Sequence, residues 1–325
     1  MADAHPFRPA NAPDIRTFAM AQMAVAMSAD RKDPERPFRE MRVSVGTTAD
    51  GAFRPKLTFA SDMPDVAAAV MRGEIDLGTF NPTGYLTMAC RGVGPFPQPL
   101  PLAAIGVMPS LDWMVFAVSE RLGVASLADI RDRRVPLRVS VRARPSDSTR
   151  FVVDQALGAL GFSLADIQQW GGSVQLVDGP RHPSRIEGIR EGTIDAVFDE
   201  GITGWGHIAL AAGMRFSHLG AEAERRLADL GWRLLPVSRA EFPEMREDVV
   251  SVSFSGWPLF TRADLDEDLA YEMARALDTA RLLVPWDSET PVELRDLCVS
   301  TDAAPLDSPL HVGAARYYRE HGALS

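Results

Sequence analysis

The chain has 325 residues, of which 46% are hydrophobic and 24% are charged, and this size and composition fit two globular domains with a substantial core. Its formal net charge of −10 argues against nucleic acid and anionic lipid as partners. No segment is apolar over the ~18 consecutive positions that a membrane span needs, so we expect no membrane insertion.

The first predicted element is a helix over about residues 13–28. It overlaps the best candidate for an export signal, TFAMAQMAVAMSA at residues 17–29. Gln22 interrupts this apolar run and acidic residues precede it, so we expect an ordinary helix and a cytoplasmic protein. If residues 1–29 are instead an atypical signal, the protein is periplasmic.

Beyond a charged, proline-containing loop, short apolar runs alternate with helical segments. Strands are predicted at residues 41–46, 57–60, 75–80, 102–107, 113–118, 135–143, 174–178, 194–200 and 249–254. Helices are predicted at residues 64–73, 149–160, 184–192, 205–213, 265–283 and 313–322. This alternation predicts an α/β fold with mostly parallel sheets and helices on both faces.

One layout occurs twice in the chain. RGEIDLGTFNPTGY at residues 72–85 parallels EGTIDAVFDEGITGW at residues 191–205. In each copy a helix ends at glycine, a strand with an Ile-Asp pair follows, and a turn leads into another helix. We interpret the two copies as one in each of two lobes.

The residues that bind metals or carry covalent chemistry show no recognised spacing. Cys90 and Cys298 are far apart and are expected to be buried thiols, although a disulfide between them stays open. The six histidines form no paired-ligand pattern. The chain also carries no G-x-S-x-G elbow, no Walker loop and no G-x-G-x-x-G after its first strand. We therefore expect neither a metal nor a nucleotide cofactor.

Polar residues gather where predicted strands end and helices begin. In open α/β sheets, ligands bind beyond the carboxyl ends of the strands, and helix N-termini can receive a carboxylate there. The alternative is that these residues only cap their own helices. The candidates are Ser61, Asn81, Thr83, Ser146, Ser148 and Thr149.

Charged and aromatic residues flank the same turns. Arg142 and Arg144 can point to one side of their strand, where a guanidinium either pairs with a ligand carboxylate or lies solvated at the rim. Asp199 and Glu200 can receive an amine or brace a hinge. Trp205 can stack on a ligand, although tryptophans more often lie in the core.

Few residues in this sequence are candidates for catalysis. His207 lies close to Asp199 and Glu200 along the chain, and these three are the candidate proton donors or acceptors if the protein is an enzyme. The other interpretation of His207 is a surface or core histidine without a catalytic role.

The order of several motifs resembles the TAXI family of TRAP-transporter solute receptors. SPLHVGAARYYREHG at residues 308–322 is similar to the closing pattern of that family, with Val312 where the family usually has proline. MRGEIDLGTF, SLADIRDRRV, EGTIDAVFDEG and LDEDLAYEMARAL are similar to earlier family segments and follow in the same order. The resemblance covers about residues 41–322.

This resemblance implies a two-lobed, type 2 periplasmic-binding-protein-like fold. Lobe 1 would comprise residues 1–112 and 236–325, and lobe 2 would be inserted as residues 113–235, with the ligand cleft between them. The implied ligand is a small organic acid or amino acid, and the implied partner is a membrane permease. The implied ligand contacts are the six polar residues named above, with Asp199 and Glu200 beside the cleft.

The chain departs from the family near its start, where VGTTADGAF is followed almost at once by LTFA and the family's long helix is missing. The helix at residues 13–28 can fill the vacated place. We expect a binding protein for transport, sensing or carriage. The alternative is a cytoplasmic decarboxylase or lyase of a small aromatic or cyclic carboxylic acid, because DIQQWGGSVQLVDG is mildly similar to dihydroxyphthalate decarboxylases.

Overall fold

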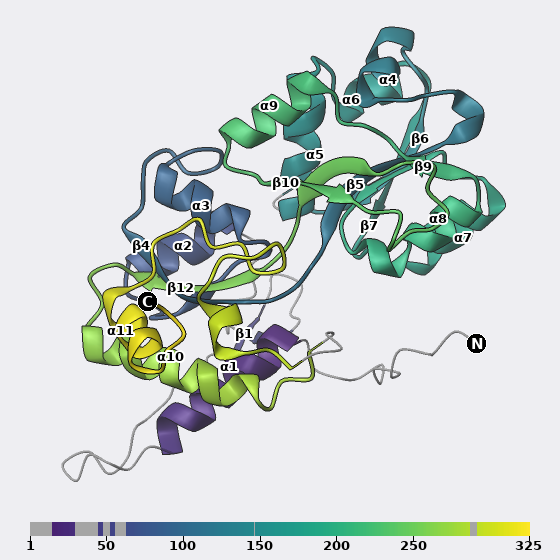
Figure 1. Ribbon diagram of the computed structural model, residues 1–325. Helices are drawn as coiled ribbons and strands as arrows, with labels where there is room; N and C mark the ends of the chain where they lie inside the picture. Colours follow the sequence, from purple (N-terminus) through teal and green to yellow (C-terminus); the bar gives the residue numbers. More distant parts are fainter. Residues whose placement is uncertain (1–14, 30–44, 48–52, 56–62, 146, 287–290) are drawn as a thin grey trace, which may run out of the picture.

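The computed structural model describes residues 15–29, 45–47, 53–55, 63–145, 147–286 and 291–325. These residues form two lobes, each built on its own sheet, with chain segments crossing between them (Figure 1). The predicted strand at residues 57–60, part of the predicted strand at 41–46, and the candidate residues Ser61 and Ser146 lie outside the described residues.

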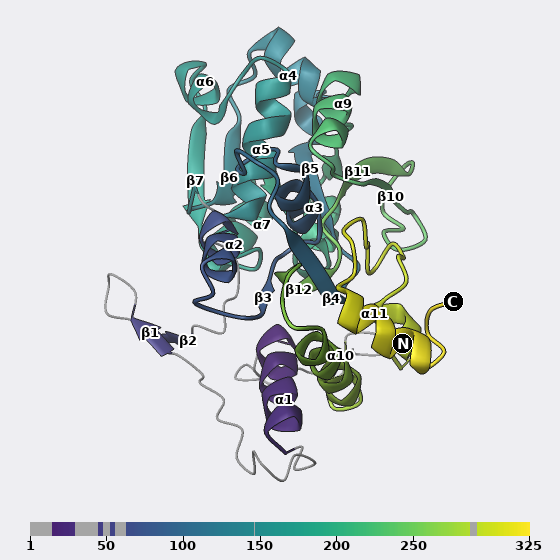
Figure 2. The ribbon, with the colours of Figure 1, turned by 90° about the vertical axis from the view of Figure 1, so that its left-hand side faces the viewer.

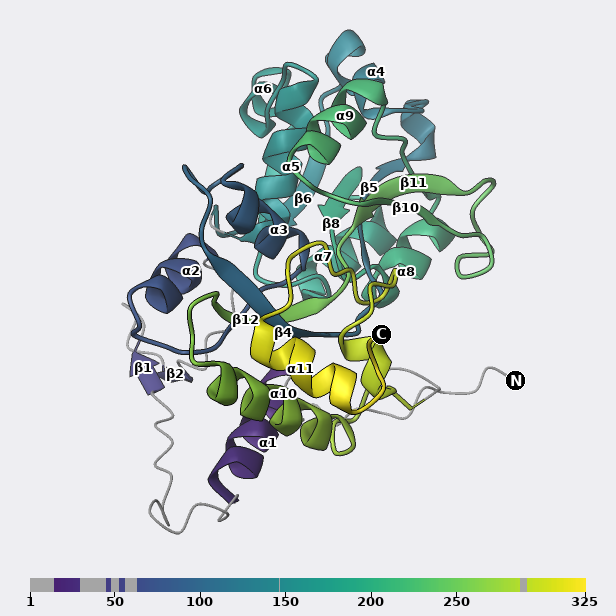
Figure 3. The same cartoon turned by 60° about the vertical axis from the view of Figure 1, so that its left-hand side comes forward.

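Lobe one contains a three-stranded sheet among the described residues, in the order β3-β12-β4 and antiparallel throughout. Alternation along β12 sends Leu259 toward one helical layer and Phe260 toward the other. Helices α1, α10 and α11 form the first layer (Figure 3), and α2 and α3 form the second. The elements of this lobe are α1 Ile15–Ala29, α2 Met63–Met71, β3 Gly78–Thr79, α3 Gly84–Arg91, β4 Leu102–Met108, β12 Trp257–Arg262, α10 Glu267–Arg281, η3 Leu294–Leu297 and α11 Val312–Glu320. A separate hairpin joins β1 Val45–Thr47 to β2 Phe53–Pro55.

Lobe two contains a seven-stranded sheet among the described residues, in the order β10-β11-β5-β8-β6-β7, with β9 also paired to β5. Its strands are β5 Trp113–Ser119, β6 Arg138–Arg142, β7 Ser173–Val177, β8 Ala196–Asp199, β9 Met214–Phe216, β10 Leu234–Val237 and β11 Val249–Ser253. Its helices are η1 Glu120–Leu122, α4 Leu127–Arg133, α5 Ser148–Ala159, α6 Leu164–Gln169, α7 Pro183–Glu191, η2 Ile202–Gly204, α8 Gly206–Ala211 and α9 Ala221–Asp229. Helices α4, α5, α6 and α9 cover one face of the sheet, and α7 and α8 cover the other.

The α/β class and the two lobes are confirmed, but the sheets are mixed rather than mostly parallel. Among the described strands, β6 pairs in parallel with β7 and β8, and the other pairs are antiparallel. The reason is the path of the chain between lobes. It enters lobe two through β5 and leaves through β11, so these neighbouring strands run in opposite directions.

The lobe boundary predicted at residue 236 falls inside β10, and both β10 and β11 belong to the seven-stranded sheet. The predicted strand at residues 75–80 shortens to Gly78–Thr79. The elements β9, β10, β12, α4, α6 and α9 have no counterpart among the predicted segments.

Helix α1 is part of the core of lobe one. Its side chains Ile15, Ala19 and Met23 are at most 2% exposed and pack with residues of α10, including Met273 and Leu277. This helix therefore occupies a structural place in lobe one, as expected for residues 13–28. No helix within the described ranges combines the length and the apolar character that crossing a membrane requires.

Two short linkers connect the lobes and are bonded to each other. Gly256 donates its backbone N–H to Ser110 over 2.9 Å, and Phe254 donates to Asp112 over 2.8 Å. Gly256 has a φ of +75°, and a Cβ atom there would lie 2.4 Å from the Thr83 hydroxyl. Glycine is thus required where the returning linker passes against the start of α3.

Candidate functional site

The N-termini of α3 and α5 come from different lobes and meet at one junction (Figure 2). The Tyr85 hydroxyl donates a hydrogen bond to the Ser148 backbone oxygen over 3.1 Å. The Tyr85 ring packs edge-on against Trp232, with ring centroids 5.3 Å apart, and also contacts Phe151. Burial raises the pKa of Tyr85 well above its ordinary value, so the hydroxyl stays a donor. The turns that precede the two helices therefore lie close together.

Most of the residues at the start of these helices already form hydrogen bonds within the protein. Asp147 caps α5 by accepting the Thr149 N–H over 3.0 Å. Asn81 accepts a hydrogen bond from Trp257 Nε1 over 3.1 Å. Thr83 is the N-cap of α3, but its buried hydroxyl makes no capping bond and has no partner among the described residues. Ser148 and Thr149 are at most 4% exposed.

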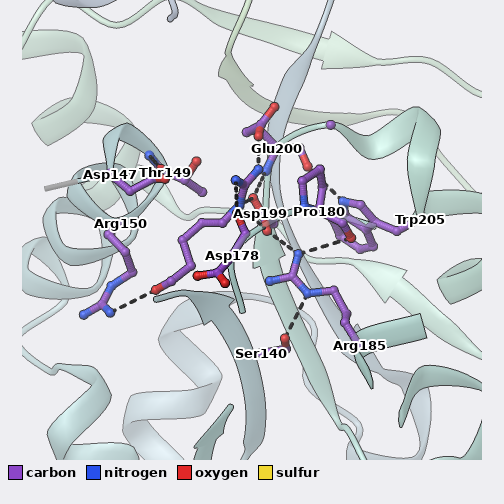
Figure 4. Close-up of polar contacts among 12 residues, drawn as sticks. Ser140, Asp147, Thr149, Arg150, Asp178, Pro180, Arg185, Asp199, Glu200 and Trp205 are labelled. Atoms are coloured by element: carbon purple, nitrogen blue, oxygen red, sulfur yellow. Dashed lines mark hydrogen bonds and ion pairs between the residues drawn. The ribbon is translucent and has the colours of Figure 1, made fainter. Parts of the chain in front are cut away.

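An ionic cluster lies next to this junction in lobe two (Figure 4). Arg142 Nε donates to both carboxylate oxygens of Asp199, over 2.8 and 2.9 Å, and Arg142 Nη2 pairs with Glu200. Arg185, on α7, pairs with the same Asp199 and donates to the Ser140 hydroxyl over 2.9 Å. Alternation along β6 places Ser140 and Arg142 on the sheet face that α7 covers.

Asp112 extends this cluster to the interlobe linker. Its two carboxylate oxygens accept the Gly201 N–H over 2.8 Å and the Ile202 N–H over 3.4 Å. Burial raises the pKa of Glu200 well above its ordinary value, the Asp112 charge raises it further, and Arg142 opposes the shift. Burial also raises the pKa of Asp112. The charge on one carboxyl group therefore affects the protonation of the other.

The structure gives some candidate ligand contacts other roles. Arg142, expected to meet a ligand carboxylate, already has two carboxyl partners within lobe two. Trp205, expected to stack on a ligand, is fully buried and donates its Nε1–H to the Glu200 backbone oxygen over 2.9 Å. Arg144 is exposed and forms no ion pair with the other residues that the structure describes.

The three candidate catalytic residues do not form one catalytic group. His207 is exposed on α8, where it pairs with Glu244 over 3.1 Å and stacks on Phe242. Asp199 is fully buried between two guanidinium groups. Glu200 keeps 14% of its side-chain surface exposed. Within the described ranges, no three His, Cys, Asp or Glu side chains are grouped as metal ligands.

Sequence reasoning missed Asp112 and Arg185. Asp112 precedes a strand rather than following one, so the rule of strand carboxyl ends does not select it. Arg185 stands in a helix whose other charged residues suggest a solvated surface. The available signal was the spacing of the apolar residues Ile186 and Ile189 in the segment PSRIEGIRE, which marks the neighbouring helix face as buried.

A family model matches part of the chain, and several solved structures resemble it distantly. A model of the NMT1-like family matches residues 221–322, the segment from α9 to α11. No curated protein matches the chain.

Three solved structures illustrate the likeness. MatC from Rhodopseudomonas palustris with bound malate is 11% identical over 95% of this chain and 90% of that one, with a TM-score of 0.42. An ancestral arginine-binding protein bound to arginine is 13% identical over 80% of each chain, with a TM-score of 0.34. The alkanesulfonate-binding protein SsuA from Xanthomonas axonopodis pv. citri is 16% identical, with a TM-score of 0.34, over 70% of this chain and 62% of that one.

Proposed function

We propose that this chain binds a small polar molecule with a carboxylate, an organic acid or an amino acid, between its lobes, for transport, sensing or carriage. The observation that carries the proposal is the meeting of two helix N-termini from separate sheets, joined by the bond from Tyr85 to Ser148. Tyr85 and Trp232 fill the space directly between α3 and α5. The ligand would therefore lie beside this contact, near residues 144–145 and 147–149.

The charges around that turn favour a carboxylate paired with an ammonium group. The 12-residue helix α5 presents its positive N-terminal end there. Arg144 is exposed next to it, whereas the charge of Arg142 is already balanced by Asp199 and Glu200. Asp178, exposed after β7, offers an acceptor for an ammonium. We therefore expect amino acids to bind better than dicarboxylates.

The packing of α1 bears on the proposed cellular setting. Removing residues 1–29 as an export signal would take Ile15, Ala19 and Met23 out of the core of lobe one. This supports a protein that keeps α1 and works in the cytoplasm as a sensor or carrier. The TAXI resemblance, whose closing motifs lie inside the NMT1-like match, supports the receptor alternative with a permease partner. An enzymatic role would have to depend on Glu200. His207 pairs with Glu244 on the exposed face of α8, and Asp199 is buried between two guanidinium groups.

The test is a thermal-shift screen of the full chain against L-amino acids, monocarboxylates and dicarboxylates, because a ligand that binds only the folded state raises the melting temperature. We expect an amino acid or monocarboxylate to raise it. Calorimetry with that compound should then show that Arg144→Ala weakens binding about tenfold or more.

The matched control is Arg225→Ala, an exposed arginine on α9 of the same lobe, which should leave the affinity unchanged. A screen in which no compound stabilises the protein contradicts the proposal. An equal loss of affinity in the Arg225 variant would contradict the assignment of Arg144.

A further inference from the structure

A cavity of about 80 Å³ lies within lobe two, between β9, the end of α8 and the loop that leads into β11. Strand β9 pairs with residues 117–119 at the far end of β5, whereas the interlobe linker precedes Trp113 at its start. At about 3.3 Å per strand residue, roughly 15–25 Å separates this end of β5 from the linker. The cavity is therefore distinct from the proposed interlobe site.

The inner wall of this cavity is apolar. The hydrophobic side chains that line it are each at most 9% exposed and belong to one core cluster of lobe two: Leu210, Met214, Phe216, Met245 and Val249. A molecule that enters the cavity gains from placing an alkyl group against this wall.

The acidic side chains around the cavity already have partners within the protein. The pairs are Glu120 with Arg246 over 2.7 Å, Glu247 with His218 over 3.3 Å and Glu244 with His207 over 3.1 Å. These carboxylates therefore leave Arg246 without a free charge to offer, and they would repel a ligand that carries several negative charges.

Arg215, on β9, is the cationic side chain of the lining that lacks such a partner. Its Nη2 donates to the Val124 backbone oxygen, its Nε has no acceptor, and it forms no ion pair with the other described residues. Asp129 acts on Arg215 through its charge, but that carboxylate accepts the backbone N–H groups of Ala125 and Ser126 over 2.7 and 3.0 Å. A guanidinium carries a planar fork of donors that matches one carboxylate.

We propose that this cavity is a second binding site, for a short-chain monocarboxylate such as propionate, whose carboxylate pairs with Arg215 and whose alkyl chain lies against Phe216 and its neighbours. An apolar cavity of about 150 Å³ holds benzene, so a volume near half of that suits a chain of about two to four carbons. A second carboxylate on the ligand would meet Glu120 and Glu247 and would find no unpaired cation among the described lining residues.

Saturation-transfer NMR of the full chain with sodium propionate tests this, at an ionic strength held constant with sodium chloride. We expect binding in the millimolar range, because so small a ligand makes few contacts. Arg215→Gln removes the guanidinium, and Leu210→Phe fills the cavity from α8 while keeping Arg215. Each variant should weaken propionate binding at least tenfold. Malonate, which has a carboxylate in place of the methyl group of propionate, should bind the wild-type protein at least tenfold more weakly than propionate.

The matched control is Arg239→Gln, an exposed arginine on the loop between β10 and β11 that does not line the cavity, and it should bind propionate as the wild type does. No saturation transfer to propionate in the wild type would overturn the proposal. Unchanged affinity in whichever of the Arg215 and Leu210 variants folds would overturn it too, because propionate would then lie elsewhere. Malonate binding as tightly as propionate would overturn the assignment to monocarboxylates. Binding here depends on Arg215 and binding between the lobes on Arg144, so the two proposals fail separately.

Discussion

At the scale of single residues, Asp199 holds the polar cluster of lobe two together. It is fully buried and accepts from Arg142 and Arg185, and it also accepts the Glu200 backbone N–H over 2.8 Å. A buried guanidinium is costly unless an anion faces it. The two arginines and Asp199 therefore depend on each other, and none of them is available to a ligand without breaking the cluster.

We predict that Asp199→Ala lowers the free energy of unfolding by about 3–5 kcal/mol, because it leaves two buried guanidinium groups without their shared carboxylate. Urea denaturation of the full chain measures this. Asp154→Ala is the control, since Asp154 is half exposed and 3.7 Å from Arg150, and its loss should cost less than about 1 kcal/mol. Equal losses in the two variants would show that the cluster does not contribute as described.

The same scale shows why the protein's own partners of Arg142 were not predicted. Alternation along β6 correctly predicts that Arg142 lies on a polar face near the strand end. The pattern does not reveal that Asp199, 57 residues later, occupies the neighbouring strand position. Only the pairing of β6 with β8 places this carboxylate where a ligand was expected.

At the scale of elements, helices were easier to predict than strands. The segments predicted at residues 149–160, 265–283 and 313–322 correspond to α5, α10 and α11 within a few residues, because each carries a 3.6-residue apolar period. Strand β12, WPLFTR, was missed because it contains proline and lacks alternation. It is a strand because β3 and β4 flank it on both sides.

Helix α1 provides a prediction at this scale. Met23→Ala should lower the free energy of unfolding by about 2–5 kcal/mol, since Met23 is 2% exposed and packs within the core of lobe one. Gln22→Ala on the same helix should change it by no more than about 0.5 kcal/mol. Thermal and urea unfolding measure both, and an unaffected Met23 variant would mean that α1 does not pack as described.

At the scale of the whole molecule, the two lobes share one apolar core. The largest buried cluster contains Phe80 and Leu86 from lobe one together with Phe116 and Val153 from lobe two. The Tyr85 ring lies within the same cluster and links the helices α3 and α5. Lobes that bury side chains against each other in this way should not unfold independently.

We therefore predict a single cooperative unfolding transition for the full chain. Calorimetric and van't Hoff enthalpies should agree, and circular dichroism and tryptophan fluorescence should give coincident transitions. Tyr85→Ala removes the side chain that bridges the lobes, so we expect it to lower the melting temperature and to broaden or split the transition. Two transitions in the wild-type protein would contradict a shared core.

The sequence by itself determined the α/β class, most of the helices and the turns at which polar residues gather, because these depend on local periodicity and on capping chemistry. It indicated the two lobes through one layout that occurs twice and through the family resemblance. Tertiary structure alone decided that β6 pairs with β8, that Arg142 meets Asp199 rather than a ligand, and that Asp112 contacts the loop after β8. Those contacts join residues 57 to 89 positions apart, and no local pattern records which distant strand becomes a neighbour.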